Sequence, residues 1–176
     1  MTGSSRTCQY AVAVAGYGEN VGLPESVTLL GIHHIAVVVR DLEAATKRYQ
    51  ALGFHLLDIG DLPEQGVRIA AFLAGSDYLE VLTPLDADSG VARYLAARGD
   101  GLHHVAYAVP DLAAALRTLE HAGFELIDRE PRAGLHGWQV AFVHPRSCYG
   151  VLTELVQVSP SSTSHVDDVR SSEEHP

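Results

Sequence analysis

An internal duplication is the feature that most limits what this chain can fold into. Residues 31–58 and 101–128 align without a gap, and 13 of the 28 aligned positions are identical. Both copies begin with paired histidines at the start of an apolar stretch, "IHHIAVVV" at 32–39 and "LHHVAYAV" at 102–109. Repeated supersecondary units usually bury their apolar faces against one another. The chain is therefore expected to form two similar modules that pack together.

Each copy predicts the same order of elements. An alternating apolar strand is followed by Asp41 or Asp111 at the N-cap position of a helix, and Gly53 or Gly123 is placed to end that helix. The later strands are expected at 54–59, 67–74 and 78–83 in the first copy, and at 124–129, 138–143 and 151–157 in the second. Each module thus reads strand, helix, three strands, which makes the fold class α+β.

The domain is expected to span residues 31–157. Within it, module 1 covers 31–85, a linker with a short helix at 91–98 covers 86–100, and module 2 covers 101–157. Residues 1–30 have no counterpart in the second copy and are expected to be an N-terminal extension of uncertain order. The polar segment 158–176 is expected to be a disordered tail.

Composition excludes several classes of partner. The chain of 176 residues is 47% hydrophobic and carries a formal net charge of −10, so a nucleic-acid backbone is not an expected ligand. Cys8 and Cys148 are too few for a disulfide framework. The apolar segment near Cys8 is too short to span a membrane. We therefore expect a cytoplasmic protein that binds neither nucleic acid nor membranes.

The paired histidines raise the question of which face of the sheet each one uses. Strand side chains alternate, so His33 and His34 are expected on opposite faces, and so are His103 and His104. The residues that share a face with His33 and His103 are mostly bulky, which indicates a core beneath the helices. The residues that share a face with His34 and His104 are smaller and leave space for a ligand.

Two carboxylates complete a candidate metal site. Glu80 in "YLEVL" and Glu154 in "VLTELV" occupy equivalent apolar strands, where an unpaired charge is costly. Packing of related modules would bring both near His34 and His104. Imidazole and carboxylate ligands suit Zn²⁺, Co²⁺, Mn²⁺, Fe²⁺ or Ni²⁺ rather than Ca²⁺. A single histidine at a strand end is more often a hydrogen-bonded structural residue, but its duplication favours a metal site.

Three stretches resemble the vicinal oxygen chelate superfamily, which has the glyoxalase fold, and most closely its methylmalonyl-CoA epimerases. They are "LPEQGVRIAAFL" at 62–73, "YLEVLTPLDADSGVARYLAARGDGLHHVAYAV" at 78–109 and "HPRSCYGVLTELVQ" at 144–157. The resemblance covers about 31–157. It implies two tandem βαβββ modules that form an open cup-shaped mixed sheet around one divalent metal ion, Co²⁺ or Mn²⁺ before other ions, in a homodimer. It places the ligands at His34, Glu80, His104 and Glu154.

The resemblance also implies an activity. Epimerases of this kind invert the α-carbon of a 2-carboxyacyl-CoA thioester such as methylmalonyl-CoA, by removing and returning a proton through a metal-stabilised enolate. Inversion needs two positioned acid/base groups. Glu154 is one candidate. Glu64 is the other, because relatives carry a carboxylate in the strand after "PEQG" and this chain has no acid between Glu64 and Asp77. The alternative for Glu64 is a purely structural turn.

Gln65, Arg146 and His136 are expected to contact the substrate. His136 lies in "RAGLHGWQV" at 132–140, where relatives tend to have a smaller and more glycine-rich loop. This loop and the missing carboxylate leave two alternatives open. The chain could be a vicinal oxygen chelate enzyme, an isomerase, lyase or cyclase, that acts on a different biosynthetic substrate. It could also be a metal-free small-molecule-binding protein of the same fold.

Overall fold

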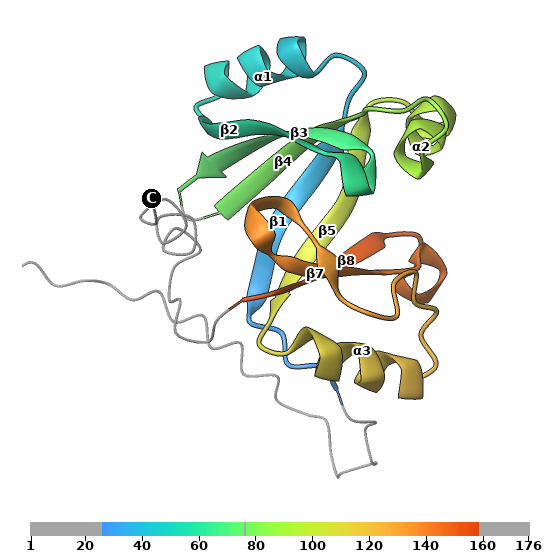
Figure 1. Cartoon of the computed structure of the whole chain (residues 1–176). Coiled ribbons are helices and arrows are strands. Elements are labelled where there is room, and N and C mark those ends of the chain that lie inside the picture. Colours follow the sequence, from blue (N-terminus) through green and yellow to red (C-terminus); the bar gives the residue numbers. More distant parts are fainter. Residues whose placement is uncertain (1–25, 76, 159–176) are drawn as a thin grey trace, which may run out of the picture.

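The computed structural model describes residues 26–75 and 77–158, which form one curved sheet with helices packed against it (Figure 1). The strands are β1 Gly31–Val38, β2 His55–Leu62, β3 Val67–Ala74, β4 Asp77–Pro84, β5 Gly101–Val109, β6 Arg132–Ala133, β7 Gln139–Val143 and β8 Leu152–Gln157. The helices are α1 Leu42–Ala51, α2 Gly90–Arg98 and α3 Leu112–His121, with short 3-10 turns η1 Pro63–Gln65, η2 Leu135–Gly137 and η3 Pro145–Cys148. The extension predicted at 1–30 falls outside these ranges up to residue 25, as does the predicted tail from residue 159.

The strand order confirms the duplicated architecture. The sheet runs β2-β3-β4-β1-β5-β8-β7-β6, so each module contributes one half. The halves meet at the antiparallel pair β1 and β5, and each of these two strands has a parallel partner in its own module, β4 or β8. Helices α1 and α3 lie on the outer sides of the two halves, at opposite ends of the molecule (Figure 1). The fold is the expected mixed, cup-shaped sheet.

The register relates the two modules by an approximate twofold axis. His34 lies opposite Ala106 across the β1–β5 junction, and His104 lies opposite Ala36. On the other side of each alanine stands a carboxylate, Glu80 beside Ala36 and Glu154 beside Ala106. Because the alanine side chains are small, the polar side chains on either side of them can approach one another over the sheet.

The helix ends follow from single residues. Asp41, Ser89 and Asp111 cap the three helices, and each side chain accepts a hydrogen bond of 2.8 to 3.0 Å from the backbone N–H three residues later. Such caps satisfy N–H groups that have no partner inside the helix. Gly53 and Gly123 follow α1 and α3 with φ of +101° and +82°, values that favour glycine. The caps at Asp41 and Asp111 and the ends at Gly53 and Gly123 were predicted.

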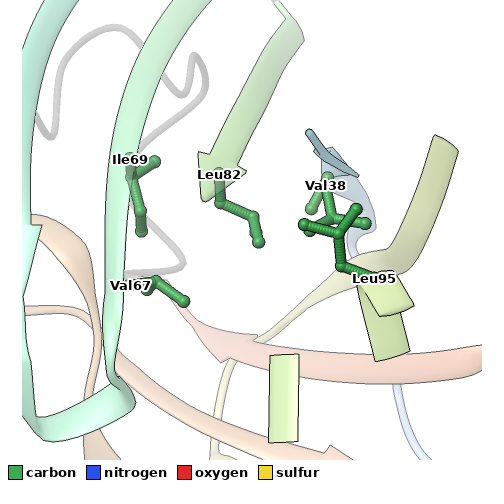
Figure 2. Close-up of a cluster of buried hydrophobic side chains, with 6 residues drawn as sticks. Val38, Val67, Ile69, Leu82 and Leu95 are labelled. Carbon is green, nitrogen blue, oxygen red and sulfur yellow. The ribbon is translucent and has the colours of Figure 1, made fainter. Parts of the chain in front are cut away.

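The inner face of module 1 carries an apolar cluster. It consists of Ala36, Val38, Val67, Ile69, Leu82 and Leu95, and Figure 2 shows the last five converging from strands β1, β3 and β4 and from helix α2. Leu135 of module 2 packs against this cluster. On the outer face, the strands of module 1 pack beneath α1 around Phe72, which is fully buried. The sheet thus has apolar contacts on both faces.

One predicted strand is wrong. Residues 124–129 form only an isolated bridge between Leu126 and Val143. The Asp128 carboxylate accepts a hydrogen bond of 2.8 Å from the Phe142 N–H, in a place where a strand would offer a backbone carbonyl. A side-chain acceptor of this kind takes an N–H that would otherwise donate to the ladder. Pro131 then follows and has no N–H to donate.

Across the described ranges, the helices are too short and not apolar enough for any of them to cross a membrane.

Candidate active site

A cavity of about 400 Å³ opens on the inner side of the sheet, between the two modules. His34, Glu80, His104 and Glu154 line it, and each of these four residues is 6% exposed or less. Each comes from a different one of the four central strands, β1, β4, β5 and β8. The apolar cluster of module 1 supplies much of the wall, including Val67, Ile69 and Leu82.

Two β-bulges place the paired histidines, and they correct the prediction that the members of each pair lie on opposite faces. The β1–β5 register shifts between Ile32 and His34, and again between Ala36 and Val37. The extra residue is His33 in the first shift and His103 in the second. A bulge interrupts side-chain alternation and leaves two residues opposite one. The two rings of each pair therefore lie side by side, rather than on either side of the sheet.

The contacts show the result. His33 Nδ1 lies 2.9 Å from His34 Nδ1, and His103 Nδ1 lies 2.9 Å from His104 Nδ1. Alternation predicted that His33 and His103 would pack into the core beneath the helix of their own module. Neither residue does so. The His33 ring instead lies 4.4 Å from Trp138, centre to centre, and His103 lines the cavity.

The four predicted metal ligands converge. His34 Nε2 and His104 Nε2 are 3.0 Å apart, and Glu154 Oε2 lies 3.0 Å from the first and 3.1 Å from the second. Glu80 Oε2 is 3.6 Å from His34 Nε2. Ligand atoms of His34, Glu80 and His104 all lie within 4.8 Å of one another.

This arrangement fits a divalent cation. Nitrogen and oxygen ligands bind such ions at about 2.1 Å, which places neighbouring ligand atoms roughly 3.0 Å apart in an octahedron and roughly 3.4 Å apart in a tetrahedron. The observed separations of 3.0 to 3.6 Å fall close to that range. Glu154 is also buried, and its Oε2 faces both imidazoles of the cluster. A carboxylate oxygen in that state is costly unless a cation faces it.

The charged side chains of the cluster shift the pKa values of His34 and Glu154. Burial lowers the pKa of His34, but Glu80 and Glu154 outweigh it and raise the pKa to about 9. For Glu154, burial raises the pKa, yet His104 and His34 hold it well below its usual range. At neutral pH and without metal, His34 is therefore a cation beside an ionised Glu154. A metal ion must displace that proton to use His34 Nε2.

Outside the cluster, the pKa of His103 is lowered to about 4, first by burial and then by the neighbouring His104. His103 is therefore neutral at physiological pH.

The predicted substrate-binding residues lie in different places. Gln65 lines the cavity, and its Nε2 donates a hydrogen bond of 3.1 Å to the Ala133 carbonyl of module 2. His136 does not line the cavity; its backbone has a φ of +54° and its ring lies against Trp138. Arg146 is exposed, 3.7 Å from Glu125, and lies outside the cavity lining.

Glu64, the predicted second acid/base group, is exposed on η1 and does not line the cavity. Among the described lining residues, the carboxylates are Glu80 and Glu154 alone.

Sequence reasoning missed Arg132 and Tyr94 as lining residues. Arg132 lies 3.2 Å from Asp128 and over the Phe142 ring. Tyr94, on α2, donates a hydrogen bond of 2.7 Å to the Leu102 carbonyl. An arginine at the start of the divergent 132–140 loop is the signal that would have indicated the first. Nothing in the sequence distinguishes Tyr94 from a core residue of the linker helix.

Comparison with known proteins identifies the family. Residues 33–142 match the model of the Glyoxalase/Bleomycin resistance protein/Dioxygenase superfamily. The mitochondrial methylmalonyl-CoA epimerase of Mus musculus is 35% identical over 166 residues, which cover 89% of this chain and 92% of the relative. The ethylmalonyl-CoA/methylmalonyl-CoA epimerase of Cereibacter sphaeroides is 37% identical over 130 residues, which cover 72% of this chain and 97% of the relative.

Solved structures agree. The methylmalonyl-CoA epimerase of Mycobacterium tuberculosis superposes with a TM-score of 0.72 at 31% identity, covering 79% of this chain and 95% of the other. A variant of the Streptomyces coelicolor methylmalonyl-CoA epimerase, in complex with 2-nitronate-propionyl-CoA, gives a TM-score of 0.72 at 36% identity, covering 76% and 100%. With this fold and this cavity, the chain belongs to the glyoxalase, bleomycin resistance protein and dioxygenase superfamily, and within it to the methylmalonyl-CoA epimerase family of isomerases.

Proposed function

We propose that this protein is a metal-dependent epimerase that inverts the α-carbon of a 2-carboxyacyl-CoA thioester such as methylmalonyl-CoA. The observation that carries the proposal is the cluster in the cavity in which His34 Nε2 lies within 3.6 Å of His104 Nε2, Glu80 Oε2 and Glu154 Oε2. The relatives named as epimerases support the substrate class, and so does the neighbouring structure with 2-nitronate-propionyl-CoA.

The four side chains suit the chemistry that such a reaction needs. A divalent metal ion bound there would supply a Lewis acid that lowers the energy of negative charge developing on the thioester oxygen. The two imidazoles contribute neutral ligands, while the two carboxylates balance the charge of a dication. Because all four side chains are buried, this charge balance is reached away from bulk water. Electrostatic interactions are stronger there than in water.

The remaining residues of the cavity would position the substrate and exclude water. Val67, Ile69 and Leu82 form an apolar wall beside the cluster, which is suited to the alkyl substituent on the α-carbon. Gln65, on the same module, presents an amide at the cavity. We propose that Gln65 contacts polar groups of the thioester. His136 and Arg146, which lie outside the cavity lining, are the other two candidates for contacts with the substrate.

Proton transfer needs a carrier on each face of the α-carbon. Glu154 is the proposed carrier on one face. Glu64 remains the candidate that the sequence offered for the other, although its exposed position on η1 gives that role no geometric support.

An isotope experiment tests the proposal directly. Purified protein loaded with Co²⁺ is incubated with one epimer of methylmalonyl-CoA in deuterated water. Inversion together with deuterium at the α-carbon is the expected result, because the proton removed exchanges with solvent before a proton returns. If neither inversion nor deuterium uptake occurs in protein that contains one equivalent of metal, the proposal is wrong.

A second candidate keeps the α-deprotonation and changes the substrate. It is favoured by the described lining, which offers no carboxylate apart from the two ligands Glu80 and Glu154. A reaction with a single proton carrier would suit such a cavity. Deuterium uptake without inversion, measured over a panel of 2-carboxyacyl thioesters with larger substituents, would favour this candidate over the epimerase.

We also propose that the native metal is Co²⁺ or Mn²⁺, that the protein is a homodimer, and that it is located in the cytoplasm. The exposed apolar residues Ile32 and Ile35 of β1 support an interface with a second copy. Metal analysis of protein purified without added metal tests the first attribute, light scattering tests the second, and cell fractionation tests the third.

A further inference from the structure

We infer that His33 and His103 are positioning residues that fix the tautomer and the ring orientation of the ligand histidines His34 and His104. The inference rests on the proposed metal site. It assigns a role to the first histidine of each pair, which the proposed reaction leaves without one.

The number of protons on each imidazole decides which nitrogen donates. His33 Nδ1 and His34 Nδ1 lie 2.9 Å apart, a hydrogen-bond distance at which one nitrogen must donate and the other accept. The opposite nitrogen of His34, Nε2, faces His104 and Glu154 in the cluster. A metal ligand must offer a lone pair, so Nε2 carries no proton and the proton of His34 sits on Nδ1. His34 therefore donates, and His33 accepts through Nδ1 and carries its own proton on Nε2.

The second module repeats the arrangement. His103 Nδ1 lies 2.9 Å from His104 Nδ1, and His104 Nε2 faces the same cluster. The same count makes His104 the donor and His103 the acceptor. The contact therefore belongs to the duplicated strand and its bulge rather than to the surroundings of one module. Here each contact depends on its own bulge, and the two bulges are related by the axis between the modules.

The packing holds each supporting ring in place. His33 is 1% exposed, stacks on Tyr78 at 5.8 Å and meets the edge of Trp138 at 4.4 Å between ring centres. His103 lies at 4.9 Å from the ring of Tyr94 on α2. Trp138 comes from module 2, so the ring that supports the first-module ligand is itself held by the other module. Ligand imidazoles generally depend on such partners, whose loss costs roughly 10- to 100-fold in metal affinity.

The first test reads the tautomers directly. Long-range ¹H–¹⁵N correlation spectra are recorded on protein labelled with ¹⁵N-histidine and loaded with Zn²⁺, a diamagnetic probe. We expect His34 and His104 to be protonated on Nδ1, and His33 and His103 on Nε2. A proton on Nδ1 of His33 or His103 would overturn the inference for that pair. The measurement uses the unmodified protein, so it holds even if a variant fails to fold.

The second test measures metal affinity in matched variants. H33F and H103F keep an aromatic ring and remove the acceptor, whereas H33N and H103N keep an acceptor oxygen. Titration with Co²⁺ against a chromophoric chelator should show a 10- to 100-fold loss in each Phe variant and partial recovery in each Asn variant. H55N, which removes an exposed imidazole of β2 far from the cluster, is the control and should leave the affinity unchanged.

The outcomes separate the inference from the proposed function. An unchanged affinity in the Phe variants, or equal losses in the Phe and Asn variants, overturns the positioning role while the metal site stands. Failure of the unmodified protein to bind Co²⁺ removes the metal site, and the inference falls with it. Thermal unfolding of the metal-free variants shows whether a loss of affinity reflects a loss of folded protein.

Discussion

His34 and Glu154 face each other across the junction between the two modules, with 3.0 Å between Nε2 and Oε2. They come from strands that are not neighbours, because β5 lies between β1 and β8. Ala106 of β5 is paired with both residues and is fully buried. The contact between imidazole and carboxylate therefore depends on a side chain small enough to lie beneath it, and Ala36 holds the equivalent place for Glu80 and His104.

The variant A106V should separate these two side chains. Added methyl groups in a packed site force side chains apart and typically cost about 1–3 kcal/mol of folding free energy. We expect that destabilisation together with a loss of Co²⁺ affinity of more than tenfold, measured by chelator competition. A108V, on the same strand and also fully buried, is the control, because it should destabilise the protein without lowering the affinity. Equal affinities in the two variants would contradict the role assigned to Ala106.

The stability of the metal-free protein should fall at alkaline pH. The pKa of His34 is raised from 6.5 to about 9 in the folded state, so its contribution is complete below pH 6.5 and is lost as the pH rises through 9. The loss amounts to at most ~3 kcal/mol at one pKa unit per 1.36 kcal/mol. Urea unfolding at a series of pH values measures it. In H34N the decline between pH 6.5 and 9 should disappear; if it persists, another group is responsible.

Metal binding should release a proton near neutral pH. His34 is protonated in the metal-free protein below pH 9, and a metal ligand cannot keep a proton on Nε2. Calorimetric titration with Co²⁺ in buffers of different ionisation enthalpy should therefore report about one proton released at pH 7. Release should diminish toward pH 10 and be absent in H34N. A proton count of zero at pH 7 in the unmodified protein would contradict either the raised pKa of His34 or its role as a ligand.

The two carboxylates of the cluster should differ in their response to amide substitution. Glu154 Oε2 touches both ligand imidazoles, whereas Glu80 Oε2 lies 3.6 Å from His34 alone. We expect E154Q to lower the rate of inversion of methylmalonyl-CoA by at least about 100-fold, the usual size of an acid/base contribution. E80Q should retain metal and most of the rate, because an amide oxygen can still serve as a ligand. Metal content and inversion are measured on the same samples, and equal losses in both variants would contradict this division.

The duplication made much of the fold predictable from the sequence. Once two copies of a strand-helix unit were recognised, the caps at Asp41 and Asp111 and the ends at Gly53 and Gly123 followed from local chemistry. The clustering of His34, Glu80, His104 and Glu154 also followed, because related modules place equivalent residues around one axis. These features depend either on a few adjacent residues or on symmetry.

The features that the sequence did not reveal depend on single irregularities. A bulge adds one residue to a strand without disturbing its apolar pattern, so alternation put His33 and His103 on the wrong face. The strand expected around Leu126 was lost to one carboxylate, Asp128, which the pattern treats like any polar position. The exposure of Glu64 depends on how η1 is turned relative to the cavity, which spacing alone does not determine.

The strand order places the polar cluster on the middle of the sheet and the strands of unequal length at its two edges. All four proposed ligands come from its four middle strands, β4, β1, β5 and β8, while β2 and β6 form the two rims. One rim is a full strand of eight residues and the other has shrunk to two, yet the polar cluster between them keeps its approximate twofold arrangement. Rim residues such as Arg132 and Leu135 can thus change, and with them the shape offered to an acyl chain, without moving the atoms that would hold the cation, whereas Trp138 packs against His33 and belongs to the support of the cluster.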